Sequence, residues 1–445
     1  MKRSLTAILF LAIIALAGAF AGGQGETQAT TTDISEIDLE AIGPVEIDFW
    51  HIQATIYGEA VSEIVASFNE EYEGLVRVNE VFQGSYSDLN KKIRAAIQGG
   101  GLPNVSMAYE NDTLEYMKAD VIRPLDPFFE HPEYGLTEAD FEDIIPGVLA
   151  RQQIEQYDGA TMSWPHGNSS MGIYYNKDIL EAAGYDRPAT TWAEFEEQAI
   201  DIYEKTGIPA LAFGVGQYGN QGHLMLWMRT YGEEPISGDA SSVNFNNDAA
   251  VELLGMMQRL HEAGTMPFVE NTEQEFTNGR SAFEISTTAR TSTKAELVGD
   301  SFEWGITLIP QGDPSNPSTG LWGGNHVMFN STPEEDLASW IFMDYFAGTQ
   351  GQAIYGARTG YFPARYSSQD TEILSTNYAE WPQKGQAFSE VFPAARITTP
   401  TAAGNAIGDA VANNVMAFLS EGQFSAEQTA AKIQQEAERA LEQFN

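Results

Sequence analysis

Apolar residues fall into short strand-like runs and helical spacings after an N-terminal apolar segment. Residues 45–49 and 76–82 are short apolar runs that predict strands, and residues 59–72 between them carry apolar side chains at helical spacing. A second helix, with Ser87 as its N-cap, is expected to reach residue 98 before three glycines, and a third strand is expected over 104–108. This β-α-β-α-β order predicts a mostly parallel sheet with helices on both faces.

The second half of the chain repeats the alternation of strands and helices. We expect a strand at 173–175 with Asp178 as the cap of the following helix, and Trp192 in the core of a helix over 191–204. The remaining predicted elements are a helix over 248–263, strands at 276–285 and 302–309, and a last helix over 425–444 opened by Ser425 and Gln428 as a capping box. A polar stretch at 217–223 interrupts the pattern.

Polar and aromatic residues follow each of the first three predicted strands. In parallel sheets, ligands bind beyond the carboxyl ends of the strands. Taken singly, each segment is also compatible with an ordinary capped loop, but three in succession favour a pocket for a polyhydroxylated ligand. The residues at these ends are Trp50, His51 and Gln53, then residues 83–86 including Tyr86, then Tyr109, Glu110, Asn111 and Asp112.

The N-terminus has the pattern of a secretory signal peptide. Lys2 and Arg3 precede an apolar run over 7–17 that is too short to span a bilayer, and small residues follow it. Cleavage is expected after Ala21, with residues 22–44 as a flexible lead-in and no lipid anchor, because the chain has no cysteine. The same lack excludes disulfides and thiol chemistry. The sequence thus predicts an exported, periplasmic protein.

The charge balance and the motif content exclude several functions. The formal net charge is −40, which repels nucleic acid and anionic membranes. No metal site or cofactor is expected, since the six histidines are scattered without HxxxH or HExxH spacing and are expected to be solvated or locally hydrogen-bonded. The Gly-rich turns are not expected to bind phosphate, because no GxGxxG follows a predicted strand and no GKS or GKT motif occurs.

Seven segments in order resemble one family. They are 49–51, 82–86, 108–111, 168–178, 276–282, 323–324 and 359–363. Together they are similar to the family 1 extracellular solute-binding proteins of ABC importers, in the branch that binds sugars and glycerol 3-phosphate. The resemblance covers residues 45–445 and implies an α/β fold of two lobes, each with a mostly parallel sheet, with ligand held in the cleft between them.

The resemblance also implies a domain organisation with three hinge crossings, near Gly167, Pro310 and Gly360. Lobe one would be residues 45–167 and 310–360, and lobe two would be 168–309 and 361–445. The protein would be a monomer that is not membrane-inserted and that delivers a small-molecule carbohydrate to the transmembrane subunits of an ABC permease.

The ligand contacts implied by the resemblance are Tyr86, Glu110, Ser169, Thr287, Gly324 and Tyr361. We add Trp50, His51, Asn111, Tyr218 and Trp322 as candidates from the polar and aromatic segments. An arginine that suits phosphate in this branch aligns with Asp409, which opposes a phosphate ligand, although Arg396 is near enough in sequence to replace it.

Three functions remain to be compared. A neutral sugar or oligosaccharide is the favoured ligand. The alternative is glycerol 3-phosphate or a glycerophosphodiester. A secreted carbohydrate-active enzyme is less favoured, because catalysis needs two carboxylates about 5 to 10 Å apart and Glu110 has no evident partner.

Overall fold

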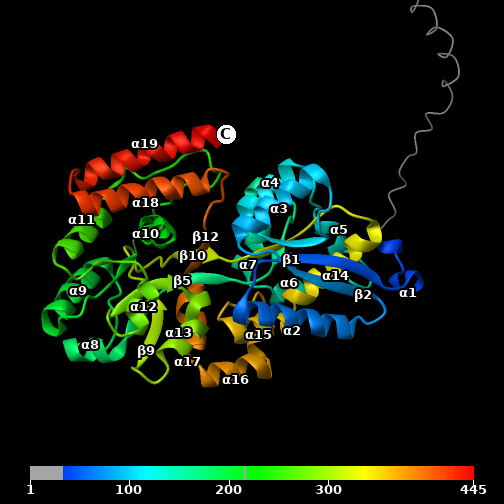
Figure 1. Cartoon of the computed structure of the whole chain (residues 1–445), viewed down its shortest axis with the longest axis horizontal. Helices are drawn as coiled ribbons and strands as arrows, with labels where there is room; N and C mark the ends of the chain where they lie inside the picture. The colour runs from blue at the N-terminus through cyan, green and yellow to red at the C-terminus, as the bar shows by residue number, and fades with distance from the viewer. Residues whose placement is uncertain (1–33, 215–216, 445) are drawn as a thin grey trace, which may run out of the picture.

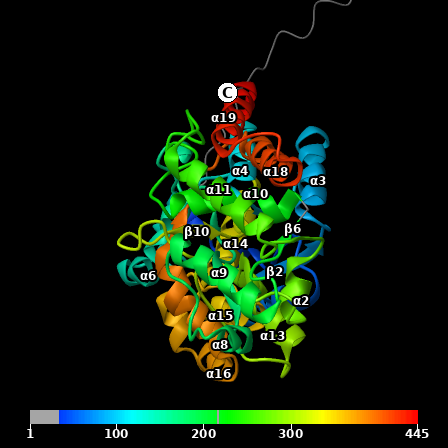
Figure 2. The same ribbon diagram turned by 90° about the vertical axis from the view of Figure 1, so that its left-hand side faces the viewer.

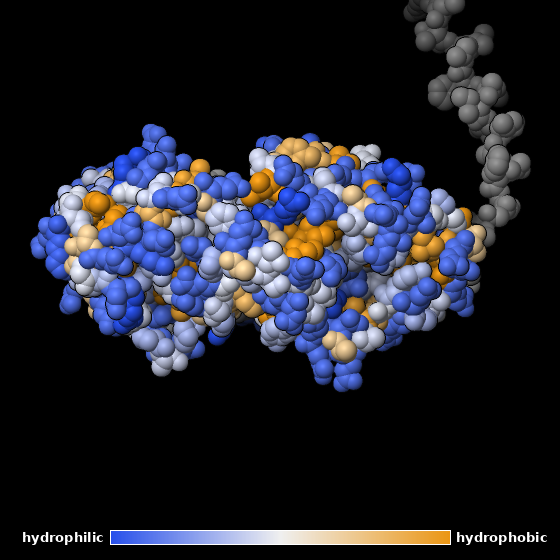
Figure 3. Space-filling view, turned by 90° about the horizontal axis from the view of Figure 1, so that it is seen from below, coloured by the Kyte–Doolittle hydropathy of each residue, from blue (hydrophilic) through white to orange (hydrophobic). Residues whose placement is uncertain are grey.

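Two α/β lobes lie side by side in the computed structural model, which describes residues 34–214 and 217–444 (Figure 1). The predicted signal peptide lies outside these residues. The end-on view shows α18 and α19 stacked at one end of lobe two (Figure 2). Seen from below, the molecule forms two rounded masses whose surface is mostly hydrophilic (Figure 3). The two-lobed α/β class expected from the sequence is confirmed.

Lobe one is built on a five-stranded sheet of order β2-β1-β3-β11-β4. Its strands are β1 (Val45–His51), β2 (Val76–Phe82), β3 (Val105–Ala108), β4 (Trp164–Pro165) and β11 (Asn325–Met328). Strand β1 alternates buried and exposed positions, so that Val45, Ile47 and Phe49 enter the core. The first three strands are parallel, and β11 runs antiparallel between β3 and β4.

Helices cover this sheet and bury its apolar side chains. They are α1 (Leu39–Ile42), α2 (Thr55–Glu71), α3 (Tyr86–Gly99), α4 (Glu110–Lys118), α5 (Asp126–Phe129), α6 (Glu138–Asp143), α7 (Pro146–Gln152), α14 (Pro333–Ala347) and α15 (Thr349–Thr359). Helix α14 packs on β1, and α15 packs on α2. Turns η1 (Ile34–Glu36) and η2 (Glu155–Tyr157) complete the lobe.

Lobe two is built on a second sheet, of order β12-β10-β5-β8, with β9 also paired to β5. Its strands are β5 (Ser169–Asn176), β8 (Phe283–Thr287), β9 (Trp304–Leu308), β10 (Thr319–Trp322) and β12 (Ala395–Ile397), and β6 (Phe213–Gly214) pairs with β7 (Phe268–Val269). Most of these pairings are antiparallel. The expectation of a mostly parallel sheet therefore holds for the first three strands of lobe one and is wrong for lobe two.

The helices of lobe two enclose a large apolar core in which Trp192 is buried, as expected. They are α8 (Lys177–Ala183), α9 (Trp192–Thr206), α10 (Gln217–Arg229), α11 (Asp248–Glu262), α12 (Thr272–Thr277), α13 (Thr291–Val298), α18 (Gly404–Glu421) and α19 (Ala426–Phe444). A connecting group follows α15: η4 (Tyr366–Asp370), α16 (Glu372–Glu380), α17 (Pro382–Gln386), η5 (Ala387–Val391) and η6 (Phe392–Ala394). Turn η3 (Thr288–Arg290) precedes α13.

The second crossing between the lobes does not lie near Pro310. Strand β10 pairs with β5 and β12 in the sheet of lobe two, and β11 pairs with β3 and β4 in lobe one. The chain therefore crosses at Gly323 and Gly324, between these two strands. The other crossings meet near Asn168 and Phe362, whose backbones form a bridge.

Several local expectations differ from the structure. Helix α3 is capped by Ser85, not Ser87, because the Ser85 hydroxyl accepts from the backbone N–H of Asp88 at 3.2 Å. Helix α8 is capped by Asn176, not Asp178. The fold also begins before Val45, since Ile37 and Leu39 are buried in the core of lobe one. The last helix has the expected capping box, with Ser425 and Gln428 bonded reciprocally.

Candidate functional site

Glu110 stands where strand β3 gives way to helix α4. As the first residue of the helix, it places its carboxylate at the positive end of the helix dipole. Its Oε1 lies 2.8 Å from Arg151 Nε and accepts from Asn325 Nδ2 at 3.1 Å. The Glu110 side chain is 17% exposed, whereas that of Arg151 is 1% exposed. Glu110 is thus a fixed carboxylate that keeps one partly open side.

Arg151 on α7 is the central cation of this region. Its guanidinium donates to Gly323 O at 3.0 Å, to Gly324 O at 3.3 Å and to Asn168 Oδ1 at 3.2 Å, and it also bonds Asn325 Oδ1. Two of the three crossings therefore meet at one side chain. Arg151 is not among the residues expected from the sequence, because it lies inside a short helix with no motif around it.

Tyrosine rings surround the same crossings. The Tyr86 ring lies 4.2 Å from that of Tyr109, and its hydroxyl lies 2.7 Å from where a Cβ on Gly324 would be. Only glycine at 324 leaves room for this phenol. The Tyr361 ring packs on Tyr355 at 5.2 Å.

The phenols in this group are neutral at physiological pH. Burial raises the pKa of Tyr86 well above its ordinary value, and burial likewise raises the pKa of Tyr361. A neutral phenol both donates and accepts hydrogen bonds, which is the chemistry that sugar hydroxyls require.

Ser169, Trp322 and Thr287 lie on the adjoining strands of lobe two. Ser169 and Trp322 are register partners in β5 and β10, and the Ser169 hydroxyl is 3.5 Å from the Trp322 carbonyl oxygen. Thr287 ends β8, where its hydroxyl accepts from the Ala289 N–H at 3.3 Å. All three residues belong to the sheet of lobe two.

His51 is buried beneath the strand ends. Its ring stacks on Phe49 at 5.5 Å, and burial lowers its pKa to about 4. Trp50, the preceding residue, packs partly buried against the core of lobe one. The side chains of five histidines are buried, not solvated: His51, His131, His166, His223 and His326. The other expectation, a local hydrogen bond, holds for His51 and His131, whose Nδ1 atoms accept from Gln53 N and Glu133 N.

A buried hydrogen-bonded chain of imidazoles supports the first crossing. His166 Nδ1 lies 2.8 Å from His326 Nε2, and His166 Nε2 lies 3.0 Å from the Tyr355 hydroxyl and 3.2 Å from Gln53 Nε2. Burial lowers the pKa of His326 to about 3 and that of His166 in the same direction, so both rings are neutral at pH 7. The residues are far apart in sequence, which explains why no spacing signalled them.

The structure describes the side chain of Asn111, one of the expected ligand contacts, but not that of Tyr218, another. Asn111 Nδ2 lies 3.0 Å from where a Cβ on Gly404 would be, so this lobe-one residue reaches the first turn of α18 in lobe two. The side chain of Tyr218 lies outside the described residues. Its backbone belongs to α10, so the polar stretch at 217–223 is helical and does not interrupt the fold.

Direct hydrogen bonds also join the lobes. The Tyr57 hydroxyl on α2 donates to Ala289 O at 3.0 Å, and Gln156 Nε2 donates to Gly238 O at 3.0 Å. Tyr57 also meets Tyr361 edge-on at 6.1 Å. Contacts of this kind, away from the crossings, hold the lobes together in this conformation.

The arginines nearest the lobe boundary are already engaged. Arg290, next to Ala289, forms two bonds to Glu273 at 2.9 and 2.6 Å. Arg229 bonds Glu234 and the backbone carbonyls of β12. Arg396 is exposed on β12 and donates to Pro393 O at 2.8 Å, while Asp409 lies on α18.

A GxGxxG spacing occurs at Gly214, Gly216 and Gly219; Gly214 ends β6 and Gly219 lies in α10, so the expectation that no GxGxxG follows a strand is wrong. The helix after it is followed by α11 and not by a parallel strand, and β7, the partner of β6, comes only after α11. This is not the compact βαβ unit of a dinucleotide site.

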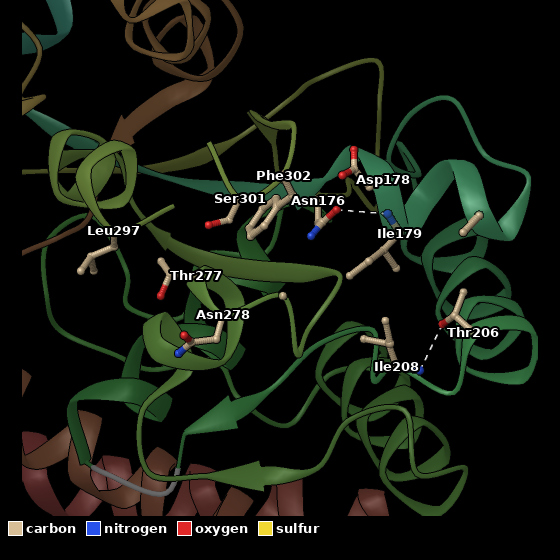
Figure 4. A pocket seen from close by; sticks show the side chains of 12 residues that line it. Asn176, Asp178, Ile179, Thr206, Ile208, Thr277, Asn278, Leu297, Ser301 and Phe302 are labelled. Carbon is tan, nitrogen blue, oxygen red and sulfur yellow. Dashed lines mark hydrogen bonds between the residues drawn. The ribbon is translucent and has the colours of Figure 1, made fainter. Parts of the chain in front are cut away.

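A surface pocket of about 470 Å³ lies away from these residues, on lobe two (Figure 4). Asn176, Thr206 and Thr277 line it, and each is already bonded to backbone: Asn176 to Ile179 N, Thr206 to Ile202 O and Thr277 to Glu273 O. None of the residues that line this pocket is among the ligand contacts expected from the sequence.

Among the residues that the structure describes, no group of three acidic or histidine side chains is arranged to hold a metal ion. Within the same described ranges, no helix has the length and apolar character needed to cross a membrane.

Comparison with known proteins identifies the class. The model of the family described as bacterial extracellular solute-binding protein matches residues 63–385, so the chain belongs to that family. It is 24% identical over 398 residues to the sn-glycerol-3-phosphate-binding periplasmic protein UgpB of Pectobacterium atrosepticum, covering 84% of this chain and 83% of the relative.

Solved structures share the fold. The cyclic alpha-maltosyl-1,6-maltose binding protein of Arthrobacter globiformis superposes with a TM-score of 0.79 at 21% identity, covering 90% of this chain and all of the other. UgpB of Mycobacterium tuberculosis, in complex with glycerophosphocholine, gives 0.77 at 19% identity, covering 90% and 99%. The sugar-binding protein MalE of Xanthomonas citri gives 0.77 at 22%, covering 90% and 98%.

Proposed function

We propose that this protein binds a neutral sugar or oligosaccharide between its two lobes and delivers it to an ABC importer from the periplasm. Glu110 would accept hydrogen bonds from sugar hydroxyls, and the neutral phenols of Tyr86 and Tyr361 would donate and accept at the crossings. Ser169, Thr287 and Trp322 would contact the ligand from lobe two. Binding alone requires no bond to be made or broken, so no catalytic group is assigned.

The observation that favours a neutral ligand is that the nearby arginines are already paired with carboxylates. Arg151 is paired with Glu110, and Arg290 is paired with Glu273 through both of its oxygens. Bidentate, charge-assisted bonds from arginine favour phosphate binding, and these guanidinium groups would have to leave their carboxylates to provide them. A neutral ligand leaves both pairs intact.

The glycerol 3-phosphate alternative is favoured by one observation, the similarity to UgpB proteins. Against it stand Asp409, aligned with the phosphate-binding arginine of that branch, and the formal net charge of −40, which repels anions. Arg396 is the residue that would have to supply the missing charge.

A panel of ligands separates the two. We expect a neutral oligosaccharide, from a set that includes maltose and maltotriose, to raise the melting temperature, with about 2.7 kcal/mol of added stability at a hundredfold excess over the dissociation constant. Glycerol 3-phosphate should give little or no shift. Differential scanning fluorimetry followed by calorimetry measures both.

A micromolar dissociation constant for glycerol 3-phosphate would overturn the choice of a neutral ligand. In that case Arg396→Gln should abolish the binding, whereas Arg94→Gln, which breaks a surface ion pair with Glu115, should leave it unchanged.

We also expect the lobes to close on the ligand. Tyr57 and Gln156 form interlobe hydrogen bonds that an open form would lack. A ligand that contacts both lobes stabilises only the closed form and therefore shifts the population toward that form. Small-angle scattering should give a smaller radius of gyration at saturating ligand, and an unchanged radius would contradict closure.

A further inference from the structure

Arg151 contacts both the candidate ligand carboxylate and the hinge. Its Nε lies 2.8 Å from Glu110 Oε1, and its Nη2 donates to the carbonyl oxygens of Gly323 and Gly324 in the second crossing. The same group donates to Asn168 Oδ1 in the first crossing at 3.2 Å. The Arg151 side chain is 1% exposed, so its guanidinium is surrounded by protein atoms and not by solvent.

Asn168 extends this link to the third crossing. Its N–H donates to Phe362 O at 3.3 Å, and the Phe362 N–H donates back to Asn168 O at 2.6 Å. Gln352 adds a parallel link, since its Nε2 donates to His166 O at 3.1 Å and its Oε1 accepts from Ala364 N at 2.9 Å. All three crossings are therefore joined through buried hydrogen bonds around Arg151.

We propose that Arg151 is a positioning residue that couples the ligand contact at Glu110 to the opening and closing of the lobes. The inference rests on the proposed function of the same cleft. When the backbone turns at Gly323 and Gly324, their carbonyl oxygens move relative to the guanidinium, which is rigid and planar. Glu110 is held by the same group, so the carboxylate is in its binding position in one hinge conformation and displaced in another.

Arg151→Lys is the discriminating variant. Lysine keeps the charge opposite Glu110, but its single ammonium group cannot replace a guanidinium that pairs with Glu110 and also donates to two carbonyls and to Asn168. Arg94→Lys is the matched control, because Arg94 pairs with Glu115 on the same helix as Glu110 but at the surface.

The interlobe distance is measured first without ligand. The chain has no cysteine, so Arg77→Cys on β2 and Glu262→Cys on α11, both exposed, carry one spin label on each lobe. Pulsed electron paramagnetic resonance measures the distribution of distances between the two labels. This distribution should be broader in Arg151→Lys than in the parent and unchanged in Arg94→Lys. Maltotriose is then added as the probe. If it narrows the distribution of label-to-label distances in the parent, it should bind Arg151→Lys about tenfold more weakly than it binds the parent.

The outcomes are distinct. If Arg151→Lys lowers only the melting temperature and leaves the unliganded distribution as in the parent, Arg151 is purely structural and the proposal is overturned. If Arg151→Lys does not fold, Asn168→Ser decides, since it cuts the link to the first crossing and leaves the pair with Glu110; it too should broaden the distribution. If no sugar narrows the parent distribution, the proposed function fails, while the ligand-free comparison still decides the role of Arg151.

Discussion

Replacing Glu110 with Gln should weaken sugar binding about tenfold to a hundredfold. A carboxylate that accepts from sugar hydroxyls makes charge-assisted hydrogen bonds worth about 1.5–3 kcal/mol, and each 1.4 kcal/mol is about a factor of ten in affinity. Glutamine has nearly the same shape, so the loss reports the charge. Calorimetry with the sugar that shows the largest thermal shift measures it.

The same substitution should also lower the stability of the unliganded protein. A carboxylate that only faced a solvent-filled cleft would leave stability unchanged, but Glu110 compensates the charge of the buried Arg151. Loss of one partner of a buried pair costs about 3–5 kcal/mol; partial exposure and the amide oxygen of Gln reduce this to about 1–3 kcal/mol.

Glu115→Gln is the control, because Glu115 is on the same helix and its pair with Arg94 is exposed. It should change stability by less than about 1 kcal/mol and leave affinity unchanged. Wild-type sugar affinity in Glu110→Gln would mean that Glu110 serves only to hold Arg151.

Substituting Gly323 with Ala should be among the most damaging single changes in the chain. The residue has φ of 143°, and an added Cβ would lie 1.9 Å from the carbonyl oxygen of Gly167. Both atoms of this contact are in crossings, so relief requires the first and second crossings to separate. Backbone strain and the clash together predict a loss of roughly 3–5 kcal/mol.

Gly147→Ala is the matched control. Gly147 lies inside α7 without a positive φ, and the nearest atom to an added Cβ is 3.8 Å away. Alanine in a helix should stabilise by up to about 1 kcal/mol. Thermal and urea unfolding measure the stability of both variants. If Gly323→Ala is as stable as the parent, the backbone at the crossings can shift enough to relieve the clash, and the prediction is wrong.

The sequence alone determined the elements whose signals are local. The strand at 76–82 has the bounds of β2, and the helix expected over 191–204 corresponds to α9, with Thr191 as the cap that bonds Glu194 N. These signals are hydrophobic spacing and capping chemistry, which act between residues a few positions apart. The order of the seven segments also sufficed to indicate the family, to which the chain belongs.

Tertiary structure decided where the lobes divide. The family resemblance implied a crossing near Pro310, yet β10 beyond it belongs to lobe two because it pairs with β5 and β12. Strand pairing depends on partners that are distant in sequence, and the direction of each pair is set by the path of the chain between them. The same limit explains the mixed sheet of lobe two.

The candidate site divides in the same way. Tyr86 and Glu110 follow strand ends and could therefore be predicted from the sequence. Arg151 has no local motif, and its role depends on partners 17 to 174 positions away in the sequence. Local spacing predicted many of the elements and the residue types available at the strand ends, and the apolar run near the N-terminus predicted an export signal. Only the fold decided which charges meet, because a buried ion pair exists only where packing excludes water from both partners.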